Sequence, residues 1–467
     1  MTTKFLRASF VLACAALAGF GQPVEPTPTP VKLVVTDMKT SVKPPKSLAM
    51  RPRQVAEPTQ MVEPTPTPVK LVVTDSMPTV RPASTPFPKP SATPIIVGSA
   101  AKASGPATNI YSETASAQQT ATYGSSAGRM LSFRQIKSLI AEAKREMQSR
   151  PIATASSEPV VMTDFVRVAF QDSRKNAIDY VVLTKDAFLS TTSDKQATSQ
   201  NGRQLTIRTI RGNGVNTPIV ILDENGQNQL PLLVQYPVVR DGKYMETAYY
   251  MSTHPGLVTS EVVGAGKYYV HNVVELAREK LRDKGVTIQP KVADIAERLA
   301  TVEHVDHQRF RTEIHQNIYN DIFTLYALNE GQTYRYSVSS AGAGGMVQMI
   351  PATYRMVRSQ YPQANLIPDF VEGMRNHVNA TQAMLLYMQS TWNDLKSSST
   401  ISDALASGLA TPEQLMAAGY NSNPARLAGY INRGGSNWTN LIPRETQIYL
   451  QIYDSLEGAV PMTPRAR

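Results

Sequence analysis

The sequence has almost no cysteine and a shortage of acidic residues. Its one cysteine, Cys14, excludes a disulfide framework, a cysteine zinc site and a cysteine nucleophile from the body of the protein. Asp and Glu number 37 against 47 Lys and Arg, which leaves a net charge of +10. Such an excess suits an anionic partner such as nucleic acid, acidic lipid or a wall polymer, without selecting among them. Beyond the N-terminus, no segment approaches the ~18 consecutive apolar residues that a membrane-spanning helix needs.

Proline is concentrated in the first quarter of the 467 residues. Seventeen of the 33 prolines lie between Pro23 and Pro94, where aromatic residues are almost absent. Such a segment buries too little apolar surface to fold, so residues 22–130 are predicted to be a disordered Pro/Thr/Ser-rich linker. Within it, Val24–Asp37 recurs unchanged as Val62–Asp75. Thr-Pro alternation favours extended polyproline II, so these residues are predicted to be a tether. The alternative is that the Val-Lys-Leu-Val-Val-Thr core of each repeat pairs with a sheet edge in an envelope partner.

The first 21 residues have the pattern of an export signal. Lys4 and Arg7 precede a mostly apolar run that ends at Gly21, and Ala16-Leu17-Ala18 fits the small-x-small cleavage pattern. A lipobox that ends at Cys14 is the competing interpretation. Both predict an exported protein of the periplasm or cell envelope, anchored to a membrane only if Cys14 is lipidated.

The middle of the chain alternates short apolar runs with turn residues. Ser132 and Gln135 form a capping-box pattern, which predicts a short helix over residues 131–150. Residues 159–290 are predicted to be a β-rich module, a small sandwich or barrel with a binding or docking role toward an envelope partner. Its expected strands are Phe165–Phe170, Tyr180–Leu183, Leu205–Ile210, Ile219–Leu222, Leu232–Tyr236 and Tyr244–Met251.

Residues 291–467 are predicted to form a mainly α-helical domain. A helical pattern runs from Val292 to Asn329 and ends at Glu330-Gly331, where glycine is a natural terminator. The helix dipole at that end disfavours a carboxylate, and apolar neighbours such as Phe323 and Tyr326 are expected to disfavour it further. Glu330 is therefore expected to hold a proton near neutral pH, as a general acid must.

A glycine-rich block follows, and two more blocks lie near the C-terminus. Glu330 is followed in order by Ser339, Gly342-Ala343, Gly345 and Gln348, then by Pro351-Ala-Thr. The later blocks are Tyr420-Asn421 and Glu445-Thr446-Gln-Ile-Tyr449. Over about Gln308–Gly458 the chain resembles the soluble (SLT) type of lytic transglycosylase, of the lysozyme-like superfamily.

The resemblance implies a lysozyme-like fold and cleavage of peptidoglycan glycan strands. Glu330 would be the single catalytic acid/base that cleaves the β-1,4 bond between MurNAc and GlcNAc, leaving 1,6-anhydromuramic ends. No metal, cofactor or nucleic acid is implied. The substrate-binding residues would be Ser339, Gly345, Met346, Gln348, Tyr420, Asn421 and Glu445.

Other interpretations stay open. A muramidase-type hydrolase would need a second acid. Residues 331–368 contain no Asp or Glu, so in that case Asp369 or Glu372 would supply it. A non-catalytic peptidoglycan-binding or assembly protein is favoured by Gly331, because the family usually has serine there. His304, His307 and His315 fall on one face of the expected helix, where they form a metal site, a contact with acidic polymer or simply a solvated polar face.

Overall fold

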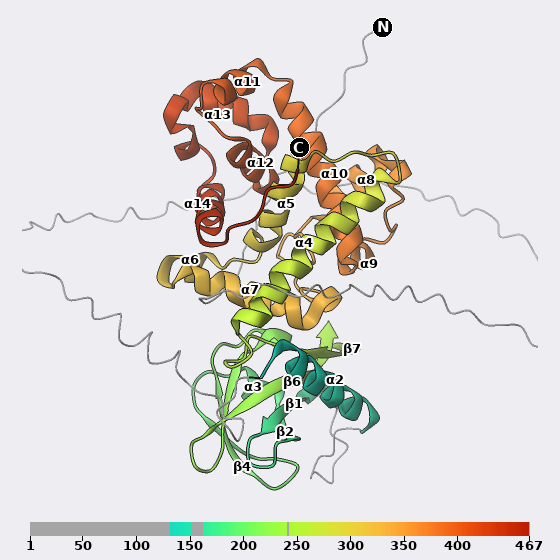
Figure 1. The fold of residues 1–467 in the computed structure, drawn as a ribbon, viewed down its shortest axis with the longest axis vertical. Coiled ribbons are helices and arrows are strands. Elements are labelled where there is room, and N and C mark those ends of the chain that lie inside the picture. The colour runs from blue at the N-terminus through green and yellow to red at the C-terminus, as the bar shows by residue number, and fades with distance from the viewer. Residues whose placement is uncertain (1–130, 151–161, 241, 467) are drawn as a thin grey trace, which may run out of the picture. The chain divides into compact units, whose positions relative to one another are not determined.

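The computed structural model describes residues 131–150, 162–240 and 242–466 (Figure 1). The expected export signal, Cys14 and the repeat-bearing linker lie outside these residues. In the described part the N-terminal third is β-rich and the rest is helical, as predicted. No helix of the described residues is long and apolar enough to cross a membrane.

The elements follow one another in an order that separates strands from helices. The β-rich part comprises α2 (Phe133–Ser149), β1 (Phe165–Asp172), β2 (Ala177–Thr184), α3 (Lys185–Leu189), β3 (Lys195–Thr198), β4 (Gln204–Thr209), β5 (Ile219–Leu222), β6 (Asn228–Arg240) and β7 (Lys243–Tyr250). The helical part comprises α4 (Ser260–Arg282), α5 (Pro290–Val302), α6 (His307–Thr312), α7 (His315–Asn329), α8 (Pro351–Gln360), α9 (Phe370–Arg375), α10 (His377–Lys396), α11 (Ser399–Ala406), α12 (Pro412–Asn421), α13 (Leu427–Gly434) and α14 (Arg444–Ala459).

The strands form one antiparallel sheet in the order β2-β1-β6-β5-β4-β3, with β7 also paired to β6. The 13 residues of β6 are enough to pair with β1 and β5 through its first half and with β7 through its second. The Gln200 N–H donates to the Tyr180 carbonyl at 2.7 Å, which links the turn after β3 to β2. The sheet therefore curls toward closure around an apolar core that includes Phe170, Phe188 and Ile207. All six predicted strands are confirmed, and β3 was not predicted.

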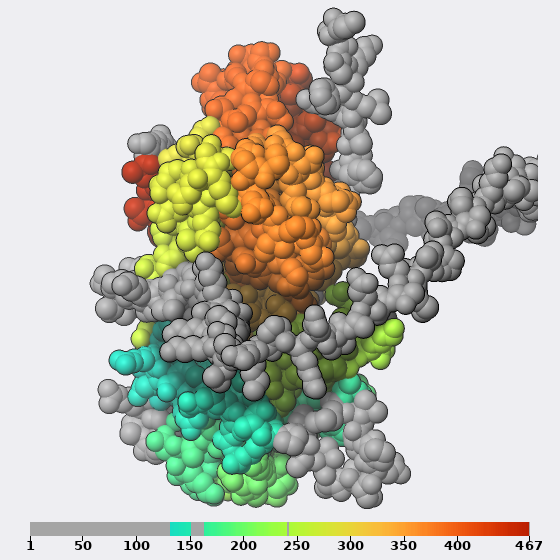
Figure 2. Space-filling model, turned by 90° about the vertical axis from the view of Figure 1, so that its right-hand side faces the viewer, coloured from blue at the N-terminus to red at the C-terminus, as the bar shows by residue number. Residues whose placement is uncertain are grey.

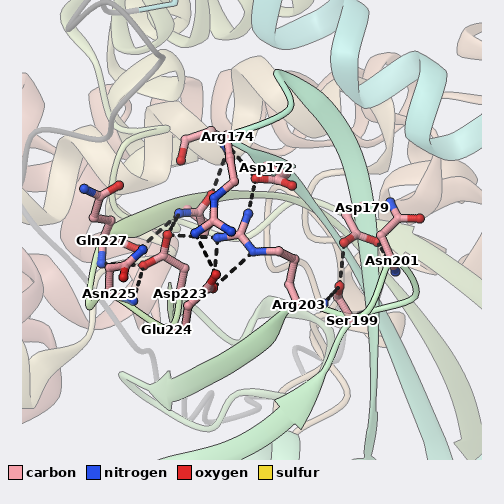
Figure 3. Close-up of polar contacts among 12 residues, drawn as sticks. Asp172, Arg174, Asp179, Ser199, Asn201, Arg203, Asp223, Glu224, Asn225 and Gln227 are labelled. Atoms are coloured by element: carbon pink, nitrogen blue, oxygen red, sulfur yellow. Dashed lines mark hydrogen bonds and ion pairs between the residues drawn. The ribbon is translucent and has the colours of Figure 1, made fainter.

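A buried arginine fixes one end of this sheet (Figure 3). Arg203 is 7% exposed and pairs with Asp172 at the end of β1, with Asp223 at 2.9 Å and with Glu224 at 3.1 Å. Arg174 approaches Glu224 from the other side at 2.6 Å. Because a buried charge needs partners to offset its lost hydration, these contacts hold three separate turns together. We interpret the cluster as structural.

Helix α2 joins the sheet to the helical part. It begins with the predicted capping box at Ser132, and its apolar face is completely covered. That face comprises Ile136, Ile140, Ala143 and Met147. It packs in one cluster with Leu232 of β6 and Leu328 of α7, so both parts of the protein contribute to this core. Lys137, on the exposed side of the same helix, points to the end of α7.

The helical core is built around α7 and α10, with α4 packed across both. The Tyr269 hydroxyl of α4 lies 2.9 Å from His377 Nδ1 of α10. Figure 2 shows the yellow-green surface of α4 directly beside the orange surface of the later helices. A Cβ on Gly266 would lie 1.8 Å from the Phe323 carbonyl oxygen, so only glycine allows α4 to approach α7 this closely. Helix α4, which falls within the predicted module of residues 159–290, therefore packs in the helical core.

The expected continuous helix from Val292 to Asn329 is three helices. The first ends at Val302, and the second begins after Asp306, whose side chain accepts the Arg309 N–H at 2.7 Å as an N-cap. The third begins after Ile314, which is 56% exposed. This break places Glu303 at a helix C-terminus.

Candidate active site

Glu303 is a buried carboxyl group at the C-terminal end of α5. Only 7% of the residue is exposed, and the Tyr449 hydroxyl donates to its Oε1 at 2.5 Å. Burial raises the pKa of Glu303 to about 8, the hydrogen bond from Tyr449 opposes the rise, and the charge of Glu445 adds to it. Glu303 therefore holds its proton at neutral pH and can release it near pH 8, which is the property of a general acid.

His304, the next residue, connects Glu303 to the glycine-rich loop. Its Nε2 lies 2.9 Å from the Met346 carbonyl oxygen, and because a carbonyl only accepts, Nε2 carries the proton. Burial lowers the pKa of His304 to about 3, so the ring is neutral. The ring also stacks on Tyr334, with centroids 3.4 Å apart and planes 3° from parallel. His304 is thus fixed on one edge and one face.

The glycine-rich loop is shaped by backbone geometry that few residues tolerate. Gly345 has φ of 66°, and a Cβ there would lie 2.5 Å from the Met374 carbonyl oxygen. Gln348 has φ of 44° without being glycine. Such conformations cost on the order of 1–3 kcal/mol and persist where the surroundings fix them, commonly at functional sites.

Two of the predicted substrate-binding residues bond within the loop itself. Gln348 is buried, and its Nε2 donates to the Gly345 carbonyl at 2.8 Å and to the Ser337 hydroxyl at 3.3 Å. The Ser339 hydroxyl accepts the Ala343 N–H at 3.0 Å. In this structure both side chains therefore support the loop conformation.

Predicted residues of the later blocks meet the loop and Glu303. The Tyr420 hydroxyl donates to the Val347 carbonyl at 2.6 Å, which ties α12 to the loop. Asn421 accepts the Thr446 hydroxyl at 2.8 Å, which ties α12 to α14. Together with Tyr449 on Glu303 and Met346 on His304, these contacts connect all three sequence blocks to one another and to the Glu303-His304 pair.

Glu330 lies in a different environment from the one predicted. Its side chain is 53% exposed and pairs with Lys137 of α2 at 2.7 Å. Phe323 and Tyr326, the neighbours expected to enclose it, are fully buried in the helical core. The expected apolar enclosure is wrong, because Glu330 is the C-cap of α7 with φ of 48° and its side chain leaves the core. The Glu330 side chain lies against α2, whereas Tyr449 of the third block bonds to Glu303 and Met346 of the glycine-rich loop bonds to the adjacent His304.

The two carboxylates considered as a second acid also have local partners. Asp369 is the N-cap of α9 and accepts the Glu372 N–H at 2.8 Å. Glu372 pairs with Arg375 at 2.8 Å and is 58% exposed. Glu445, by contrast, is close enough to Glu303 for its charge to affect that group. If a second acid is needed, Glu445 is better placed than Asp369 or Glu372.

The histidines predicted to share one helical face do not do so. His304 lies in the connection after α5, His307 begins α6 and His315 begins α7. His315 contacts the Ser455 hydroxyl at 2.7 Å and the Phe310 carbonyl at 2.8 Å. The interpretation as a common solvated face is wrong for this reason. Within the described residues, no group of three or more His, Cys, Asp and Glu side chains is arranged to hold a metal ion.

Sequence reasoning missed Glu303 because residues 292–329 were interpreted as one helix. The available signal was Asp306, an N-cap residue followed by a new helical stretch. Glu303 also ends a helix, but it lies before the region of resemblance, and α6 and α7 separate it from Ser339. Searches against known protein families, curated proteins and solved structures returned no match.

Proposed function

We propose that this protein is a peptidoglycan lytic transglycosylase in which Glu303 is the general acid and base. The observation that carries the proposal is a buried, hydrogen-bonded carboxyl group with a pKa of about 8, around which the three motif blocks converge. The motif order resembles that of the SLT-type enzymes, and Glu303 meets the chemical requirement better than the exposed, ion-paired Glu330.

The reaction follows from one carboxyl group used twice. Protonated Glu303 donates to the glycosidic oxygen between MurNAc and GlcNAc as the C–O bond breaks. The resulting carboxylate then takes the proton from the muramic 6-hydroxyl, whose oxygen attacks C1 and closes the 1,6-anhydro ring. No water is consumed, and the carboxyl group ends protonated as it began. A pKa near the working pH lets one group do both steps.

A muramidase-type hydrolase is the second candidate, and the nearness of Glu445 favours it. The charge of Glu445 raises the pKa of Glu303, which is the electrostatic relationship found between paired carboxyl groups in two-carboxylate glycosidases. In that mechanism Glu445 would activate water or stabilise the developing positive charge. The product would then carry a reducing muramic end.

Mass spectrometry of digested murein separates these candidates. A lytic transglycosylase gives muropeptides with 1,6-anhydromuramic ends, each lighter by one water than the hydrolysed product. Reducing muramic ends as the main product would favour the hydrolase. In that case Glu445→Gln should lower the rate of cleavage as much as Glu303→Gln does. Binding without any cleavage would instead support a non-catalytic peptidoglycan-binding or assembly protein.

The proposed location is the cell envelope. Residues 1–21 resemble an export signal, and a peptidoglycan substrate requires export. Either cleavage after Ala18 or lipidation at Cys14 would deliver the protein there. N-terminal sequencing of exported protein would distinguish the two.

A further inference from the structure

The segment between α7 and the glycine-rich loop is attached to the β-rich part at several points. Asn329 donates from Nδ2 to the Met251 carbonyl at 2.8 Å and accepts the Met251 N–H at 2.9 Å. The Tyr334 N–H donates to the Tyr250 hydroxyl at 3.4 Å, and Tyr250 also meets Tyr336 edge to face. The chain that enters the loop is therefore fixed to the end of β7.

Glu246, on β7, adds a charged attachment. Its two carboxylate oxygens pair with Arg335 at 3.3 Å and with Arg375 of α9 at 3.1 Å. Arg335 follows Tyr334 directly, and α9 contributes Met374, whose carbonyl oxygen closes on Gly345. One carboxylate of the β-rich part thus pairs both with Arg335, in the segment that enters the glycine-rich loop, and with Arg375 of α9, the helix that contacts this loop.

Tyr334 connects the β-rich part to His304, the residue next to the candidate acid Glu303. It has φ of 56°, a conformation that a bulky residue adopts only when its surroundings enforce it. Its ring lies flat against His304, and the edge of the Tyr326 ring closes in at 5.4 Å. Because His304 directly follows Glu303 and bonds to Met346, a shift of Tyr334 moves both the acid and the loop.

We infer that the β-rich part is a working component of the active site, in which Glu246 and Tyr334 are positioning residues that set His304, and through it Glu303 and the glycine-rich loop. This inference rests on the proposed function. It gives the β-rich part a role in catalysis that needs no separate ligand. The reaction geometry depends on such supports, since a displacement of about 1 Å at a reacting group can cost roughly 100-fold in rate.

The first test compares Glu246→Gln with Glu372→Gln in the exported full-length protein. Both residues pair with Arg375, but only Glu246 also holds Arg335. We expect Glu246→Gln to lower kcat roughly tenfold with little change in KM, and Glu372→Gln to leave both unchanged. The midpoint of thermal unfolding should be the same for both variants. Equal kcat values for the two variants would overturn the inference.

The second test uses the ring of Tyr334. Tyr334→Phe keeps the stack on His304 and should retain nearly full kcat, whereas Tyr334→Leu removes it and should lower kcat and displace the basic limb of the pH–rate profile. Unchanged kcat and pH profile in Tyr334→Leu would overturn the inference. If Glu303→Gln is fully active, the proposed function fails; if it is inactive while the Glu246 and Tyr334 variants behave like wild type, only this inference fails.

Discussion

Tyr449 donates its phenolic hydrogen to the carboxyl group of Glu303 across 2.5 Å, although the two residues are 146 positions apart in the chain. The contact joins the C-terminal end of α5 to the middle of α14. It gives a buried acid a single strong partner that favours its charged form, while burial favours its neutral form. The balance of these two effects leaves Glu303 able to exchange a proton near physiological pH.

Removing that donor should move the pH dependence of activity upward. The hydrogen bond from Tyr449 lowers the pKa of Glu303 against the effect of burial, so Tyr449→Phe should raise this pKa further. We expect the basic limb of the wild-type pH–rate profile near pH 8, and in Tyr449→Phe it should shift to higher pH as kcat falls. A basic limb that stays in place in Tyr449→Phe would show that another group sets it.

The same carboxyl group should make the protein less stable as the pH rises. Its pKa is about 8 in the folded protein and about 4.3 in an unfolded chain, so the folded state binds the proton more tightly. Its contribution to stability is fully present below pH ~4.3 and is lost as the pH rises to about 8. Glu303→Gln has no proton that titrates at this position. As the pH rises from ~4.3 to about 8, the free energy of unfolding of the wild type should therefore fall by on the order of a few kcal/mol relative to that of the variant.

Urea unfolding of both proteins at a series of pH values measures this difference. Taking the difference cancels the buried histidines, which act in the opposite direction because burial lowers the pKa of His304 and His377. A difference that is constant from pH 5 to pH 8 would mean that Glu303 is ionised in the folded protein.

Two glycines of α4 offer a matched test of the packing between α4 and α7. Gly266→Ala would place its Cβ 1.8 Å from the Phe323 carbonyl oxygen, so we expect a loss of roughly 3 kcal/mol or more, comparable with other overpacked cores. Gly264→Ala meets nothing within 4 Å and should stabilise the helix by up to ~1 kcal/mol. Chemical denaturation of the two variants checks both signs. Similar stabilities would contradict the close approach of the helices.

The strands and several helix ends could be predicted because local patterns determine them. Ile219–Leu222 matches β5 residue for residue, and the Ser132 capping box starts α2 as expected. Helix α4 could not be found in the same way. Its Gly264, Gly266 and β-branched valines are poor helix formers, and it is stabilised by packing against α7 and α10.

The three sequence blocks of the candidate site were identified from the sequence, but Glu303 was not. Gly345, Met346, Tyr420, Asn421 and Glu445 belong to the blocks that meet around Glu303. Which glutamate they surround depends on a long-range contact, from Tyr449 to Glu303, that no local pattern contains. The exposure of Glu330 likewise depends on where α2 and Lys137 pack.

The most direct measurement is the rate of murein cleavage by Glu303→Gln and Glu330→Gln, compared with the wild type at neutral pH. Each change keeps the side-chain shape and removes the proton donor. Loss of general acid–base catalysis should lower the rate of Glu303→Gln by roughly 100-fold or more, with folding and glycan binding retained. Glu330→Gln should stay within about twofold, because an exposed ion pair contributes little. Full activity in Glu303→Gln together with an inactive Glu330→Gln would contradict the account and return the acid to the end of α7.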